Sequence, residues 1–89
     1  MDTTIITVDV YCIRSDGGHA YRVFVDNDLF TERTWIWPAY DTFIRENIEV
    51  HVEPGVHTLE VRACTPENVF YTKNITVNGS LNSGSTFTV

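Results

Sequence analysis

Lysine is almost absent from this 89-residue chain, in which Lys73 is the only one. The basic residues number 6 against 12 acidic residues, and the formal net charge at pH 7 is −6. Proteins that bind nucleic acid neutralise its phosphates with clustered Lys and Arg side chains. The composition therefore argues against nucleic acid, and we expect none as a direct partner.

Long apolar runs are also missing. No stretch of the sequence approaches the ~20 apolar residues that a membrane-spanning helix needs. The first residues, Met1 to Thr4, lack the basic start and apolar block of a signal peptide. We therefore expect a chain that is made in the cytoplasm without a signal peptide and that has no membrane partner.

Leucine and alanine are scarce, with 3 residues each, whereas valine, isoleucine and threonine supply 11, 7 and 12. Side chains that branch at Cβ suit the pleated surface of a sheet better than a helix. This bias excludes an all-helical protein. A chain of this length has room for one core, so we expect a single domain over residues 1–89.

Residues 44–64 contain two alternating segments separated by Pro54 and Gly55. A two-residue period of apolar and polar side chains is typical of a strand that is buried on one face. Proline favours the first central position of a turn, and glycine accepts the positive φ that follows. We predict a β-hairpin here, with positive φ at Gly55. The expected inward residues are Ile44, Ile48, Val50 and Val52 before the turn, and Leu59, Val61 and Ala63 after it.

Five further alternating segments predict strands at residues 4–13, 20–25, 29–37, 69–77 and 86–89. In the first two, the expected inward residues are Ile6, Val8, Val10, Cys12, Tyr21, Val23 and Val25, and Tyr11 is expected on the outward face. In the segment 69–77, Tyr71 is expected to share one face with Ile75 and Val77. Seven short strands separated by turn residues are typical of an antiparallel sandwich. The predicted fold is all-β: a single antiparallel β-sandwich of about seven strands with an immunoglobulin-like arrangement.

The runs YRVFVDND at 21–28, EPGVHTLEV at 53–61 and ITVNG at 75–79 resemble PEGA-type domains, which are small immunoglobulin-like sandwiches of bacteria. That resemblance implies a structural role for His57, just after the turn. The whole chain also resembles small β-proteins encoded by tailed phages of cyanobacteria, notably in the run FTERTW at 30–35. This second resemblance implies a virion or accessory protein.

Groups that commonly perform chemistry do not form a recognisable set. The sequence has no glycine-flanked serine elbow and no phosphate-binding glycine loop, so we expect no catalytic residue, no cofactor and no enzyme. His51 and His57 are predicted on opposite faces, which argues against a metal site. Cys12 and Cys64 are likewise predicted on different faces, which argues against a disulfide between them.

Aromatic residues form the remaining signal, because Trp35, Trp37, Tyr40 and Phe43 fall within nine residues around a proline. One interpretation places one or both tryptophans in the core. Another makes the cluster an interface, since aromatic residues are enriched at protein contacts. A third is a sugar-stacking surface, for which two tryptophans on one strand face would serve. We take the interface interpretation and predict these four residues as partner-binding.

The function predicted from these observations is a non-enzymatic structural or interaction role. With the phage resemblance, the specific expectation is a small virion component, either a capsid decoration protein or a tail-associated protein, which binds capsid or tail subunits or other copies of itself. Two alternatives stay open. One is a carbohydrate- or cell-surface-binding module, and the other is a small inhibitor of a host protein.

Overall fold

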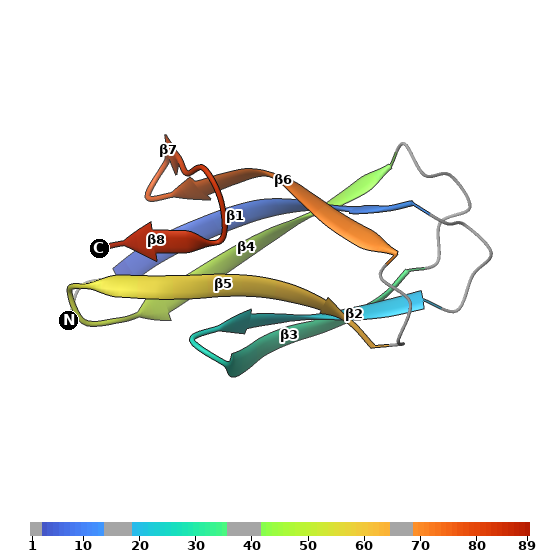
Figure 1. The fold of residues 1–89 in the computed structure, drawn as a ribbon, viewed down its shortest axis with the longest axis horizontal. Helices are drawn as coiled ribbons and strands as arrows, with labels where there is room; N and C mark the ends of the chain where they lie inside the picture. The colour runs from blue at the N-terminus through green and yellow to red at the C-terminus, as the bar shows by residue number, and fades with distance from the viewer. Residues whose placement is uncertain (1–2, 14–18, 36–41, 65–68) are drawn as a thin grey trace.

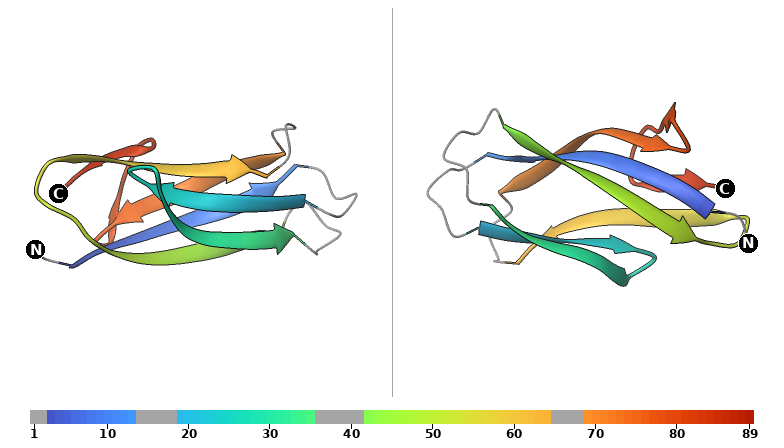
Figure 2. Two further views of the ribbon diagram at one scale, coloured as in Figure 1. Left: turned by 90° about the horizontal axis from the view of Figure 1, so that it is seen from below. Right: turned by 180° about the vertical axis from the view of Figure 1, so that it is seen from behind.

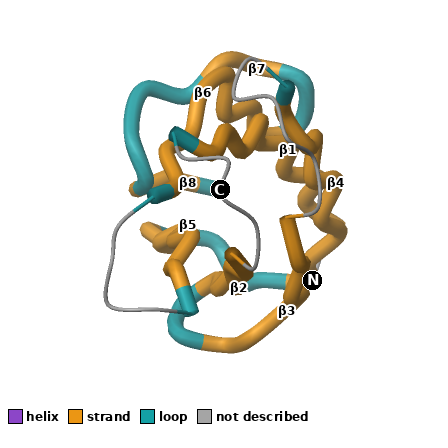
Figure 3. The backbone as a smooth tube through the Cα atoms, turned by 90° about the vertical axis from the view of Figure 1, so that its right-hand side faces the viewer, coloured by secondary structure: helices purple, strands orange, loops and turns teal. Residues whose placement is uncertain are grey.

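Two antiparallel sheets packed face to face make up the computed structural model, which describes residues 3–13, 19–35, 42–64 and 69–89 (Figures 1 and 3). The strands are β1 (Thr3–Cys12), β2 (His19–Val25), β3 (Asp28–Trp35), β4 (Phe43–His51), β5 (Val56–Ala63), β6 (Phe70–Val77), β7 (Ser80–Leu81) and β8 (Thr86–Thr88). The first sheet has the order β4-β1-β6-β7 and the second sheet the order β3-β2-β5-β8. The predicted all-β sandwich is confirmed, and the two-residue β7 is a strand that the sequence did not predict.

The core lies between the two sheets and consists of the inward side chains of their strands. The alternation predicted for β1 and β2 is confirmed, because Ile6, Val8, Val10, Cys12, Tyr21, Val23 and Val25 are all buried. Cys12 lies in this core whereas Cys64 is exposed, and within the described part of the chain no disulfide joins them. The same described residues contain no helix long and apolar enough to cross a membrane.

The segments on either side of Pro54 and Gly55 do not pair with each other, so the predicted hairpin is wrong. β4 pairs with β1 in the first sheet, and β5 pairs with β2 in the second. The chain therefore crosses between sheets at the end of the sandwich where β1 begins and β8 ends (Figure 2). Gly55 has the predicted positive φ, at 139°. It exchanges backbone hydrogen bonds with Val89, at 3.1 and 3.0 Å.

A bulge in β6 changes which of its residues face the core. Thr7 pairs with Thr76, but Asp9 pairs with Lys73, so β6 has one residue more than β1 across this interval. Asn74 lies within it at φ 55°, a conformation that asparagine tolerates better than most residues. The alternation changes phase at this point. Ile75 is buried and Tyr71 is exposed, so the face that the sequence predicts for Tyr71 is wrong.

Candidate functional site

Three aromatic rings lie side by side on the outer face of the first sheet. Tyr11 of β1 pairs with Phe43 of β4 on one side and with Tyr71 of β6 on the other. The ring centroids of Tyr11 and Phe43 are 5.2 Å apart, and those of Tyr11 and Tyr71 are 5.1 Å apart with nearly parallel planes. Phe43 is 40% exposed and Tyr71 is 38% exposed. We call Phe43, Tyr11 and Tyr71 the aromatic row.

Two cations cover the rings of this row. The Lys73 Nζ atom lies 5.2 Å from the Tyr11 centroid and 5.6 Å from the Tyr71 centroid. The Arg45 Cζ atom lies 5.6 Å from the Phe43 centroid. These distances are within the range of cation–π attraction. Lys73 and Arg45 each follow their ring residue by two positions along a strand, so they form the next row across the sheet.

Asp9 stands between these two cations and is almost fully buried, at 1% exposure. Arg45 donates to it from Nε to Oδ1 at 2.7 Å and from Nη2 to Oδ2 at 3.2 Å. The bulge residue Asn74 donates from Nδ2 to Oδ2 at 3.1 Å. The hydrogen bond from Arg45, with help from Asn74, lowers the pKa of Asp9 although burial opposes this. The ionised Asp9 therefore fixes Arg45 beside the aromatic row.

The structure separates the four residues that the sequence predicts as partner-binding. Phe43 belongs to the aromatic row. Trp35 is 1% exposed and its ring packs edge-on against Phe70, so the expectation that it binds a partner is corrected in favour of the core. Trp35 faces inward because it ends β3 opposite His19 of the central strand β2. Trp37 and Tyr40 lie outside the described residues.

Glu46 is a buried carboxylate that sequence reasoning missed. It accepts hydrogen bonds from the Tyr21 hydroxyl at 2.6 Å and from Arg33 Nε at 2.9 Å, both to Oε2. Burial and the hydrogen bond to Glu46 raise the pKa of Tyr21, so its hydroxyl stays a donor. Glu46 comes from β4 and Arg33 from β3, which belong to different sheets. This cluster therefore links the two sheets on one side of the sandwich.

His57 links three segments at the crossing between β4 and β5. Its Nδ1 donates to Asp26 Oδ2 and its Nε2 donates to the Glu53 carbonyl, both at 2.6 Å. The carbonyl of Glu53 and the carboxylate of Asp26 raise the pKa of His57, and the backbone N–H of Thr58 and the imidazole lower the pKa of Asp26. His57 thus has two hydrogen-bond acceptors of its own, and among the described residues no group of three or more His, Cys, Asp and Glu could hold a metal ion.

These shifts predict a pH-dependent stability. A raised pKa in the folded state means that His57 stabilises fully below its ordinary pKa of 6.5 and loses that effect as the pH rises through the folded value. We therefore expect the difference in unfolding free energy between the parent and a His57→Gln variant to shrink from pH 6 to pH 9. Urea unfolding at several pH values measures this difference. A difference that stays constant over the range would contradict the predicted protonation of His57.

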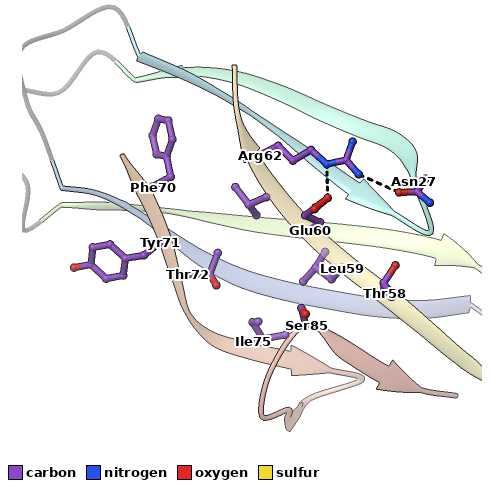
Figure 4. A pocket seen from close by; sticks show the side chains of 11 residues that line it. Asn27, Thr58, Leu59, Glu60, Arg62, Phe70, Tyr71, Thr72, Ile75 and Ser85 are labelled. Atoms are coloured by element: carbon purple, nitrogen blue, oxygen red, sulfur yellow. Dashed lines mark hydrogen bonds and ion pairs between the residues drawn. The ribbon is translucent and has the colours of Figure 1, made fainter. Parts of the chain in front are cut away.

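A groove of about 570 Å³ lies between β5 and β6 (Figure 4). Glu46 lies on the other side of the sandwich, where β3 and β4 are the edge strands. Apolar side chains from both sheets line the floor of the groove: Leu59, Val61, Phe70 and Ile75. Thr58, Glu60, Arg62 and Ser85 contribute polar groups around it. The groove opens between the sheets. Tyr71 of the aromatic row also lines it, whereas Tyr11 and Phe43 do not.

No family model, curated protein or solved structure matches this chain. The aromatic row and the groove are therefore interpreted from their own residues and geometry.

Proposed function

We propose that this protein is a non-enzymatic interaction protein that binds another protein through the aromatic row. The observation that supports this most is the exposure of Phe43 and Tyr71 beside a fixed arginine on the outer face of a sheet. Aromatic residues and arginine are the side chains that protein interfaces favour. Ile13, which follows the last residue of β1 and lies two residues after Tyr11, is also exposed and adds apolar area beside the row.

The cations over the rings favour a protein partner over a sugar. A sugar stacks on an aromatic ring that is open on one face. Here Lys73 lies over Tyr11 and Tyr71, and Arg45 lies over Phe43. A protein partner can approach the exposed ring edges and offer an acceptor to Lys73 without displacing it. Asp9 already neutralises Arg45, so Lys73 is the cation that a partner carboxylate would meet.

We further propose the virion as the setting, as an outer component of a tailed-phage particle, following the sequence resemblance. The immunoglobulin-like arrangement is part of the same proposal. Its support is that each sheet pairs strands that are distant in the sequence, such as β1 with β4 and β2 with β5. Mass spectrometry of purified particles tests the setting directly, since a particle component must be found in them.

The matched pair of variants Phe43→Ser and Phe30→Ser tests the binding face. Both phenylalanines are about equally exposed, at 40% and 44%, but Phe30 lies on β3 of the second sheet. We expect Phe43→Ser to weaken incorporation into particles, or self-association where no particle is available, by about 2 kcal/mol. Phe30→Ser should leave assembly unchanged. If the two variants behave alike, the aromatic row is not the binding face. If Phe43→Ser loses retention on immobilised glycans instead, the sugar-binding alternative replaces this proposal.

A further inference from the structure

β5 has a neighbour on both sides along only part of its length. On one edge, β8 pairs with it from Val56 to Thr58, and the Leu59 N–H donates to the Ser85 carbonyl at 2.7 Å. Beyond Leu59, no described strand pairs with this edge. On the other edge, β2 continues to pair with β5 as far as Ala63. The second half of β5 is therefore an open strand edge.

The backbone groups of Val61 and Ala63 point toward this open edge. The Thr58 carbonyl accepts a hydrogen bond from the Asp26 N–H at 3.0 Å, and the Cys64 N–H donates to the Ala20 carbonyl at 2.8 Å. The even-numbered residues along β5 therefore direct their backbone groups toward β2. Backbone groups alternate in direction along an antiparallel strand. The odd-numbered residues therefore present their N–H and C=O groups to the groove side, as Leu59 does.

The groove beneath this edge has an apolar floor and a second strand on its far side. Leu59, Phe70 and Ile75 are buried below the opening (Figure 4). Val61 is half-buried and also lines the groove. The opposite strand, β6, is interrupted by the bulge at Asn74, and bulges end regular pairing. β5 pairs with β2 without a register shift. Of the two strands that border the groove, β5 is therefore the one to which a further strand can pair.

We propose that the groove binds an extended segment of a partner protein, which adds to β5 as an antiparallel strand in line with β8. Segments bound in this way obtain affinity from backbone hydrogen bonds and specificity from alternate side chains. The segment's residues opposite Val61 and Ala63 would face the apolar floor. Those opposite Glu60 and Arg62 would lie on the outer face of the sheet.

The charges beside the open edge set the order of side chains in that segment. Arg62 is held in place by Glu60, by Asn27 at 3.0 Å and by the ring of Phe24, whose centroid lies 4.1 Å from Cζ. Opposite charges stabilise a pair that faces each other across two strands, and like charges destabilise it. Read from its N-terminus, an antiparallel segment therefore needs an apolar residue opposite Ala63, then an acidic, an apolar and a basic residue.

A capped, fluorescent peptide Thr-Leu-Glu-Val-Arg has this order and is a suitable probe, because it ends before the position opposite Leu59, which Ser85 occupies. It repeats residues 58–62, which in the folded chain are held in the sheet by β2. Its control is Thr-Leu-Arg-Val-Glu, which has the same composition with the charges exchanged. By fluorescence anisotropy, we expect the parent protein to bind the control about tenfold more weakly, because two like-charge pairs replace two opposite ones.

The double variant Glu60→Arg/Arg62→Glu should reverse this preference while it keeps an ion pair within β5. Methylation of the peptide valine nitrogen, which faces β5, should abolish binding, whereas methylation of the adjacent glutamate nitrogen, which faces away, should not. Equal binding of both peptides, an unchanged preference in the double variant, or tolerance of the N-methylvaline would each overturn the proposal.

The groove and the aromatic row share Tyr71 but not Phe43, so one more variant, at Phe43, separates the two surfaces. Phe43 lies on the outer face of the first sheet and does not line the groove, so the Phe43→Ser variant should bind the Thr-Leu-Glu-Val-Arg peptide as the parent does. Loss of peptide binding in this variant would place the peptide on the aromatic row and would overturn the groove as the site. Unchanged peptide binding together with unchanged assembly would reject the proposed function of the aromatic row and leave the groove in place.

Discussion

Replacing Trp35 with alanine is expected to lower the free energy of unfolding by about 4 kcal/mol, the cost typical of removing a large aromatic side chain from a core. The ring is 1% exposed, and its centroid lies 6.0 Å from that of Phe70 in the opposite sheet. Trp35 is therefore part of the contact that holds the sheets together near the end of β3. Urea unfolding followed by circular dichroism measures the change.

Phe30→Ala is the matched control for this substitution. It removes another aromatic side chain from β3, but Phe30 is 44% exposed. We expect a loss below about 1 kcal/mol, as surface substitutions usually give. A small effect of Trp35→Ala, similar to that of Phe30→Ala, would place the indole outside the core. That result would restore the partner-binding role that the sequence suggested for Trp35.

Alternation predicted the faces of the strands well but not their neighbours. In β1 and β2 it identified the inward apolar residues, because a two-residue period states directly which side of a strand is apolar, but it did not identify the buried Thr4 and His19. The same signal cannot say which strand lies alongside. β4 and β5 were predicted to pair across Gly55, yet they belong to different sheets. Each pairs with a strand from the first part of the chain, β4 with β1 and β5 with β2. Pairing depends on how the whole chain packs.

The candidate site was only partly predictable for the same reason. Phe43 was identified from its sequence neighbours, and Tyr11 was placed on an outward face. That these two rings meet Tyr71 depends on the register of β4 and β6 against β1. It also depends on the bulge at Asn74, which reverses the alternation of β6. The extra residue is visible only in the pairing of β6 with β1, not in the sequence. The alternation was therefore continued through Asn74, and Tyr71 was assigned to the wrong face.

Glu46 left a clearer signal in the sequence. It occupies an inward position between Ile44 and Ile48, where a carboxylate needs a partner. Arg33 lies two residues before Trp35 on β3, so both side chains lie on the inward side of that strand. Two opposite charges at inward positions suit an ion pair, and the structure contains one, with Glu46 Oε2 at 2.9 Å from Nε of the half-exposed Arg33. Parity marks both residues as inward, but that they meet depends on how the two sheets pack.

Arg33→Ala is expected to cost about 3 kcal/mol, because it leaves the Glu46 carboxylate buried without its cation. The Glu46 side chain is 3% exposed, and among the described residues the Tyr21 hydroxyl is the one donor to Oε2 that remains without Arg33. Arg22→Ala is a close control. Arg22 and Arg33 are exposed to a similar degree, at 49% and 52%, but the partner of Arg22 is Glu32, which is 52% exposed. Removing Arg22 should leave the unfolding free energy nearly unchanged, since water solvates Glu32 in its place.

A double-mutant cycle separates the cost of the lost pair from the cost of the buried charge. Arg33→Ala combined with Glu46→Gln keeps the volume of the buried side chain but removes its charge. The double variant should therefore be more stable than Arg33→Ala alone, because an amide is cheaper to bury than an unpaired carboxylate. Equal stabilities of the double variant and Arg33→Ala would mean that water reaches the carboxylate once Arg33 is gone. The ion pair would then close the side of the sandwich rather than neutralise a buried charge.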